Sequence, residues 1–215
     1  ASGQSRRASL FHVVAPLSGI GGVQSLALQQ AEVLSSKAEV HVWSIGPPNA
    51  ALVSALPVLT LDAASGNVPV GGTLVVAGTH FELGPWLAAS KAERITLAIN
   101  TDAMPTALER ITDIQEALPT VQLELTVPSR GYGVEACLPD TMVEYPGLDI
   151  VKFAPRARIK ESARRFTLGR HGRDVPSKHH PNDPAFYRSL MAEGYEVKLM
   201  GGISQRAAFK DDGDV

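Results

Sequence analysis

The chain has 215 residues, of which 44% are hydrophobic and 20% are charged, as in an ordinary globular protein with a buried core. Its formal net charge of −2 excludes a long-range attraction to nucleic acid, so any anion would have to be held by a local group of cations. The single cysteine, Cys137, excludes an internal disulfide and fits a reducing compartment. No apolar run approaches the ~20 residues that cross a bilayer, and we expect a cytoplasmic protein.

The first predicted elements are a strand, a Gly-rich turn and a helix. Residues 1–9 are polar and expected to be flexible, and the apolar run LFHVVA that follows them predicts a buried strand. The turn contains Gly21 and Gly22, and such a layout can bind phosphate. Gln24 stands where the G-x-G-x-x-G fingerprint needs glycine, which disfavours a nicotinamide-dependent oxidoreductase. The apolar stripe of the helix consists of Val23, Leu26, Ala27, Ala31 and Leu34.

The chain then alternates between strands and helices. We predict strands at residues 39–45, 57–62, 73–79, 95–100, 121–127 and 141–144, and helices at 49–56, within 81–92 and at 106–118. The last helix is amphipathic, with Leu108, Ile111, Ile114 and Leu118 expected to face inward and Glu109, Arg110 and Asp113 outward. A loop with Ser129, Gly131 and Gly133 is expected between the last two strands. This alternation predicts an α/β fold with a Rossmann-like, doubly wound parallel sheet.

A second strand–loop–helix–strand pattern begins at residue 165. The strand at residues 165–169 is followed by a loop rich in glycine and cations, and a second strand is predicted at 196–200. The helix between them is expected to have Asp183 as its N-cap, Pro184 at its first position and Gly194 at its left-handed end. We therefore predict a βαβ unit whose positive charge lies at the carboxyl end of a strand, where open α/β sheets bind ligands.

The cationic loop suits a diphosphate. Arg170 and Arg173 each offer a bidentate fork, and Lys178 offers a point charge. The alternative is a solvated loop without a ligand. The histidines of the same region, such as His179 and His180, are adjacent and have no zinc-ligand spacing, so we expect no metal site.

Two motifs in this order resemble those of retaining glycosyltransferases of the GT-B architecture (glycosyltransferase group 1). The segment YPGLDIVKFAP at residues 145–155 is similar to the interdomain signature of that family, PGVDxxxFxP. The pair Gly169-Arg170, with Lys178 further on, is similar to the start of its C-terminal domain. The resemblance implies an N-terminal Rossmann-like, acceptor-side domain at residues 10–147, a linker at 148–164 and a donor-side domain at 165–215.

The donor-side domain is too short for this family, so we expect it to be incomplete, either because the chain is a fragment or because the protein is naturally short. The acidic E-x7-E pair of the family would belong to the missing portion. Glu116 and Glu124 have that spacing by chance, since they lie in the first domain on either side of Pro119.

The resemblance also implies roles for particular residues. Arg170 and Lys178, with Arg173 as a further ligand, would bind the donor diphosphate without a metal ion. Gly21 and Gly22 match a Gly-Gly turn that faces the cleft, although a tight turn chosen for its backbone geometry is the alternative. Gly201, Gly202 and Ser129 match cleft-lining positions, with plain turn or surface roles as alternatives.

The sugar contact of the family is a histidine near a strand end, and the chain departs from that pattern. Asn100 occupies the matching position, and Asp102 or His80 are further candidates for the catalytic contact. His80 follows a buried strand, so a plain surface role is the alternative for it.

The function that the resemblance implies is transfer of a sugar from a nucleoside-diphosphate sugar, with retention and without a cofactor. The acceptor would be a carbohydrate, a lipid-linked or a small molecule, and a lipid-linked acceptor would imply peripheral contact with the inner membrane. The alternative is a truncated, non-catalytic binding module that lacks a complete donor site. No nucleic-acid partner is expected.

Overall fold

The computed structural model describes residues 9–52, 54–100, 104–135, 138, 141–144, 166–171 and 179–200. The chain divides into two compact units, Ala1–Phe153 and Ala154–Val215. None of the helices in the described ranges is long and apolar enough to cross a membrane.

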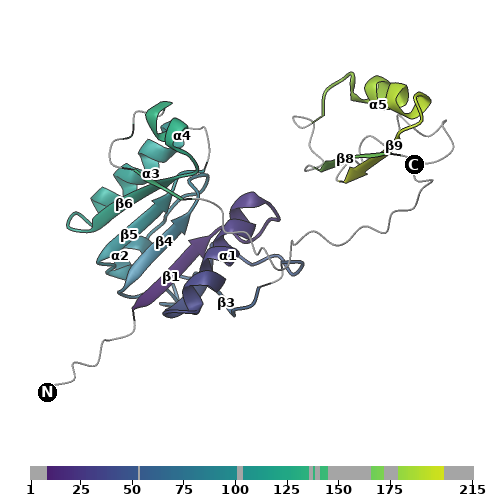
Figure 1. Ribbon diagram of the computed structural model, residues 1–215. Coiled ribbons are helices and arrows are strands. Elements are labelled where there is room, and N and C mark those ends of the chain that lie inside the picture. The colour runs from purple at the N-terminus through teal and green to yellow at the C-terminus, as the bar shows by residue number, and fades with distance from the viewer. Residues whose placement is uncertain are drawn as a thin grey trace, which may run out of the picture. The chain divides into compact units, whose positions relative to one another are not determined.

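The first unit contains a seven-stranded sheet in the order β3-β2-β1-β4-β5-β6-β7 (Figure 1). Each strand is parallel to its neighbours, which confirms the predicted parallel Rossmann-like sheet. The strands are β1 (Leu10–Ala15), β2 (Glu39–Ser44), β3 (Val58–Thr60), β4 (Thr73–Ala77), β5 (Arg94–Ala98), β6 (Gln122–Val127) and β7 (Met142–Val143). From β1 the chain adds β2 and β3 on one side of the sheet, and it then returns to add β4 to β7 on the other side of β1. Doubly wound sheets bind ligands at this switch point between β1 and β4.

Helices cover both faces of this sheet, which explains why the central strands are almost wholly apolar. The helices of the unit are α1 (Gly22–Ser35), α2 (Trp86–Ser90), α3 (Met104–Ala117) and α4 (Arg130–Glu135). On one face, Ala27 and Ala31 of α1 pack in a core cluster with Val13 and Val75. The cluster on the other face contains Val14, Val76 and Leu97 with Trp86 and Leu87 of α2 and Ala107 and Ile114 of α3. The small residues of α1 let the helix lie close to the sheet.

The predicted helix at residues 49–56 is wrong, because the described residues of this segment form turns. The side chain of Asn49 accepts a hydrogen bond from the backbone N–H of Ala51 at 2.9 Å. Ser54 Oγ accepts one from the N–H of Leu56 at 3.2 Å. Such local side-chain bonds offer the backbone an alternative to a helix. The predicted loop after β6 is also wrong in part, since Gly131 and Gly133 lie within α4.

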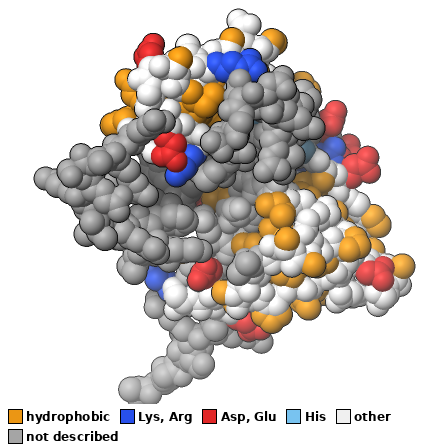
Figure 2. Space-filling model, turned by 90° about the vertical axis from the view of Figure 1, so that its right-hand side faces the viewer, with side chains coloured by type: hydrophobic (Ala, Val, Ile, Leu, Met, Phe, Trp, Pro, Cys, Tyr) orange, Lys and Arg blue, Asp and Glu red, His pale blue; other side chains and the backbone are white. Residues whose placement is uncertain are grey.

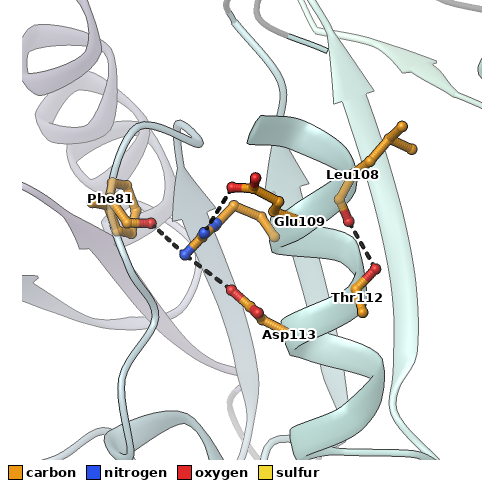
Figure 3. A network of polar contacts seen from close by, with 6 residues as sticks. Phe81, Leu108, Glu109, Thr112 and Asp113 are labelled. Carbon is orange, nitrogen blue, oxygen red and sulfur yellow. Dashed lines mark hydrogen bonds and ion pairs between the residues drawn. The ribbon is translucent and has the colours of Figure 1, made fainter. Parts of the chain in front are cut away.

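The predicted faces of α3 need one correction, which concerns Arg110. Its residue is only 9% exposed, whereas Leu108, expected to face inward, is 53% exposed. The Arg110 guanidinium donates to the carbonyl oxygen of Phe81 at 3.0 Å and lies 2.9 Å from the carboxylate of Asp113 and 3.3 Å from that of Glu109. Figure 3 shows this network between the segment after β4 and helix α3. Arg110 can therefore be buried because the carbonyl oxygen of Phe81, from the segment after β4, accepts a hydrogen bond from its guanidinium.

The second unit contains a parallel pair of strands joined by a helix, which confirms the predicted βαβ unit. Its elements are β8 (Thr167–His171), α5 (Asp183–Ala192) and β9 (Glu196–Met200). The strand predicted at 165–169 is therefore two residues off, and Arg170 lies within β8, paired with Leu199, rather than in the loop that follows. Helix α5 ends before Gly194, whose φ of +91° confirms the predicted left-handed end. The predicted N-cap is one residue off, since Asn182 is the N-cap and Asp183 is the first helical residue.

Residues from all three elements of the second unit line a cavity of about 300 Å³. Leu168 and Arg170 of β8 alternate to one face of the strand pair, as do Val197 and Leu199 of β9. They line the cavity together with Phe186, Tyr187 and Leu190 of α5 and with Gly169. The face of the strands that carries Arg170 is therefore the face that α5 covers.

A buried histidine in the first unit makes stability depend on pH. His12 is 3% exposed, and its Nδ1 accepts a hydrogen bond from Trp43 Nε1 at 3.0 Å. Burial lowers the pKa of His12 and outweighs a backbone hydrogen bond with Val70 that raises it; His41, whose ring lies 5.3 Å away, also lowers the pKa. His41 itself pairs with Glu39. The unfolded chain therefore binds a proton on His12 more readily than the folded chain does.

We expect the free energy of unfolding to be fully retained above about pH 6.5, the ordinary pKa of histidine, and to fall as the pH drops below it. Urea unfolding between pH 8 and pH 5 measures this slope. His12→Gln keeps an acceptor for Trp43 but cannot titrate, so its slope should be shallower. Equal slopes for the variant and the parent would contradict the assignment to His12.

Candidate functional site

The predicted Gly-Gly turn follows β1, at the switch point of the first sheet between β1 and β4. Strands β1 and β4 are neighbours, with Val14 paired to Val76. Helix α1 begins at Gly22, directly after β1 and its loop, and Gly21 is its N-cap in an extended conformation. Gln24, the residue that breaks the dinucleotide fingerprint, donates from Nε2 to the carbonyl oxygen of Pro16 at 2.9 Å and so closes the turn on itself.

Asn100 is brought close to this turn by the glycine that follows β4. Gly78 has a φ of +95°, and a Cβ atom on it would lie 3.1 Å from Cγ1 of Val23 and 3.6 Å from Oδ1 of Asn100. The backbone of Gly78 therefore lies close to the side chain of Val23, in the first turn of α1, and to that of Asn100. Only glycine allows both contacts without strain. Gly78 thus lies close both to Val23, the residue after the predicted Gly21–Gly22 turn, and to Asn100.

Three polar side chains without partners among the described residues lie at the carboxyl edge of the first sheet. Thr79 Oγ1, which follows β4, is fully buried, and neither it nor Asn100 Oδ1 has a hydrogen-bond partner among the described residues. Ser44 Oγ, at the end of β2, is buried and unpaired within the same part of the chain. A buried polar atom left unpaired costs about 1–3 kcal/mol, so several of them at one edge of a sheet call for an explanation. Each of these oxygens is itself buried, so a ligand could pair with one only if the surrounding side chains moved.

Sequence reasoning missed Thr79 and Ser44 as site residues. Each is a hydroxyl residue at the end of a strand or just after it, and parallel strands place these ends at one edge, but the residue types alone do not mark a site. His80 and Ser129 are both exposed. His80 follows Thr79 directly, whereas Ser129 follows β6, which is separated from β1 by β4 and β5. The structure therefore does not bring Ser129 to the Gly-Gly turn. The predicted residues Asp102, Arg173, Lys178, Gly201 and Gly202, like the linker at 148–164, lie outside the described residues.

In the second unit, Arg170 lies near the carboxyl end of β8 and is held by two side chains of α5. Its Nη1 donates to the hydroxyl oxygen of Tyr187 at 2.6 Å and to the carboxylate of Asp183. The same carboxylate oxygen accepts the backbone N–H of His180 at 3.0 Å. The bonds to Tyr187 and Asp183 raise the pKa of Arg170, and the Arg170 guanidinium lowers the pKa of Asp183. Both groups of the ion pair are therefore charged near neutral pH.

A separate cavity of about 580 Å³ lies between α2 and α3. Three carboxylates line it, those of Glu82, Asp113 and Glu116, and Arg110 is the cation among its lining residues. Since Arg110 is already bonded to Phe81 and Asp113, the net field in this cavity disfavours a diphosphate. The described residues contain no group of three or more His, Cys, Asp or Glu side chains that could hold a metal ion.

The face drawn in Figure 2 shows no large patch of one charge sign among the described residues. On the face drawn in Figure 2, acidic and basic side chains are interspersed and hydrophobic ones occur in small groups. Anion binding would therefore depend on a local arrangement such as that of Arg170. No protein-family model, curated protein or solved structure matches the chain. What the protein does must be inferred from its own residues.

Proposed function

We propose that the protein is a retaining glycosyltransferase of the GT-B type, which moves a sugar from a nucleoside-diphosphate sugar to an acceptor without a metal ion. The observation that carries this proposal is the close approach of Gly78 to Asn100 and to Val23, which follows the Gly21–Gly22 turn, at the carboxyl ends of the neighbouring strands β1, β4 and β5. The second βαβ unit, with Arg170 near the carboxyl end of its first strand, adds a cation of the kind that a donor diphosphate needs.

The proposed reaction builds negative charge on the leaving diphosphate. The bond between the anomeric carbon and the diphosphate oxygen breaks, and the acceptor oxygen forms a new bond to the same face of that carbon. The proton of the acceptor hydroxyl passes to the leaving diphosphate. Arg170, with Lys178 and Arg173 as further ligands, stabilises the developing charge. Such stabilisation replaces a metal ion because guanidinium and ammonium groups carry their charge permanently at neutral pH.

The sugar and the acceptor belong, in this proposal, to the carboxyl edge of the first sheet. Asn100 contacts the sugar, with His80 and Asp102 as further candidates for that contact. The side-chain amide of Asn100 is suited to hydroxyl groups, which both donate and accept hydrogen bonds. A carbohydrate, lipid-linked or small-molecule acceptor would fit equally.

A second candidate is a non-catalytic binding module with the same fold. The observation that favours it is the engagement of Arg170 by Asp183 and Tyr187, since a guanidinium so bonded has less to offer a diphosphate.

Calorimetric titration with UDP-, GDP- and ADP-sugars tests the proposal, followed by measurement of free sugar released from any donor that binds. We expect saturable binding of one nucleotide class and slow hydrolysis of its sugar. Binding without release of sugar would favour the binding module. The absence of heat with all three nucleotides would contradict a donor site.

A further inference from the structure

The carboxylate of Asp183 lies in an environment built for an anionic oxygen. Its Oδ2 accepts two hydrogen bonds. One comes from the charged guanidinium of Arg170, and the other comes from the backbone N–H of His180 at 3.0 Å. It also lies at the first residue of α5, where the helix dipole favours negative charge. The side chain of Asp183 is only 16% exposed, so water competes little for these bonds.

We propose that Asp183 is an internal counter-ion which occupies the place of a ligand phosphate oxygen on Arg170, and that Tyr187 is the residue that positions the guanidinium. This inference rests on the proposed donor site and deepens it. A diphosphate that binds Arg170 must displace the Asp183 carboxylate or share the guanidinium with it. Asp183 therefore sets the affinity of the site for phosphate groups.

Tyr187 has a different part in this arrangement. It is 7% exposed, and its hydroxyl oxygen lies 2.6 Å from Nη1 of Arg170. Because the hydroxyl carries no charge, it restricts the orientation of the guanidinium without competing electrostatically with a phosphate. An arginine that is already ordered loses less conformational entropy when it binds. The two partners of Arg170 are thus expected to act in opposite directions on ligand affinity.

Titration of the protein with inorganic pyrophosphate tests this inference without a sugar nucleotide. Asp183→Asn keeps an oxygen acceptor for Arg170 and His180 but removes the charge, and we expect pyrophosphate to bind about 3- to 10-fold more tightly. Tyr187→Phe should bind about 3-fold more weakly. Arg170→Ala should bind at least about 10-fold more weakly.

Glu193→Gln is the matched control, because it removes the same unit of charge from an exposed position just beyond the other end of α5. We expect this variant to bind like the parent. A loss of folding in the Asp183 variant would weaken binding, so a gain in affinity separates the proposed role from a structural one.

Several results would overturn the inference: unchanged or weaker binding in Asp183→Asn, an equal gain in Glu193→Gln, or no binding of pyrophosphate to any variant. The proposed function fails separately. If the pyrophosphate affinities follow the expected order and no nucleotide sugar is bound or hydrolysed, the internal counter-ion stands and the glycosyltransferase proposal does not.

Discussion

Replacing Gly72 by alanine is expected to lower the free energy of unfolding of the first unit by about 3 kcal/mol. Gly72 precedes β4 with a φ of +64°, and a Cβ atom there would lie 2.6 Å from the carbonyl oxygen of Leu10 and 3.2 Å from its Cβ. The left-handed conformation alone costs an alanine about 1–2 kcal/mol. The clash adds to this because the atom that must move belongs to the backbone of β1, which pairs with β4.

The adjacent glycine provides a matched control. Gly71 has a φ of +71°, and a Cβ atom on it would meet nothing within 4 Å. Gly71→Ala should therefore cost only the conformational strain, about 1–2 kcal/mol. Urea unfolding of the two variants and the parent gives the comparison. If the two variants lost the same free energy of unfolding, the close approach of Leu10 to Gly72 would be contradicted.

The strands of the first sheet could be predicted because each is a short apolar run bounded by turn residues. Residues 10–15 were predicted with the observed bounds, and β4 was predicted only two residues too long. A strand that is buried on both faces leaves such a run in the sequence. The order of the strands is not encoded in any one run. The order depends on which strands are neighbours, and the pairing of β1 with β4 is seen only in the structure.

The errors on helices have a local cause in one case and a distant cause in the other. At residues 49–56, Asn49 and Ser54 satisfy nearby backbone groups, and this competition was readable from their residue types. On α3, the position of Arg110 could not be read from the helix alone. Its acceptor is the carbonyl oxygen of Phe81, 29 residues away, and an apolar stripe assigns an arginine to the solvent by default.

In the candidate site, too, some features could be predicted from the local sequence, whereas others depend on contacts between distant residues. The Gly21–Gly22 turn and Asn100 were singled out from sequence, by motif and by order along the chain. Gly78 was not singled out, because only the structure shows how close it lies to Val23 and Asn100, which are distant from it in the sequence. The partners of Arg170 were equally out of reach. Asp183 has the residue type of a helix cap, and only the structure shows that its carboxylate bonds to a strand residue.

Replacing Arg170 by alanine is expected to lower the turnover of the proposed donor sugar by about 10²- to 10³-fold, the effect of removing one donor that stabilises charge in a transition state. The side chain of Arg170 is 36% exposed, and Tyr187 and Asp183 orient its guanidinium, which is charged. Sugar release from the nucleotide that binds in the calorimetric screen measures the effect. The change should appear mainly in kcat, since charge builds up on the diphosphate only as the bond breaks.

Lys198→Ala is the matched control, because Lys198 is a cation on the same pair of strands but on the opposite face. In the strand register it is paired with Gly169, whereas Arg170 is paired with Leu199. Lys198 pairs with Glu196 at 3.0 Å, and its side chain is 60% exposed. Its loss should leave turnover within about 2-fold of the parent, because an exposed ion pair contributes little. If both variants lost activity equally, the cause would be damage to the strand pair; if neither did, Arg170 would not hold the leaving group.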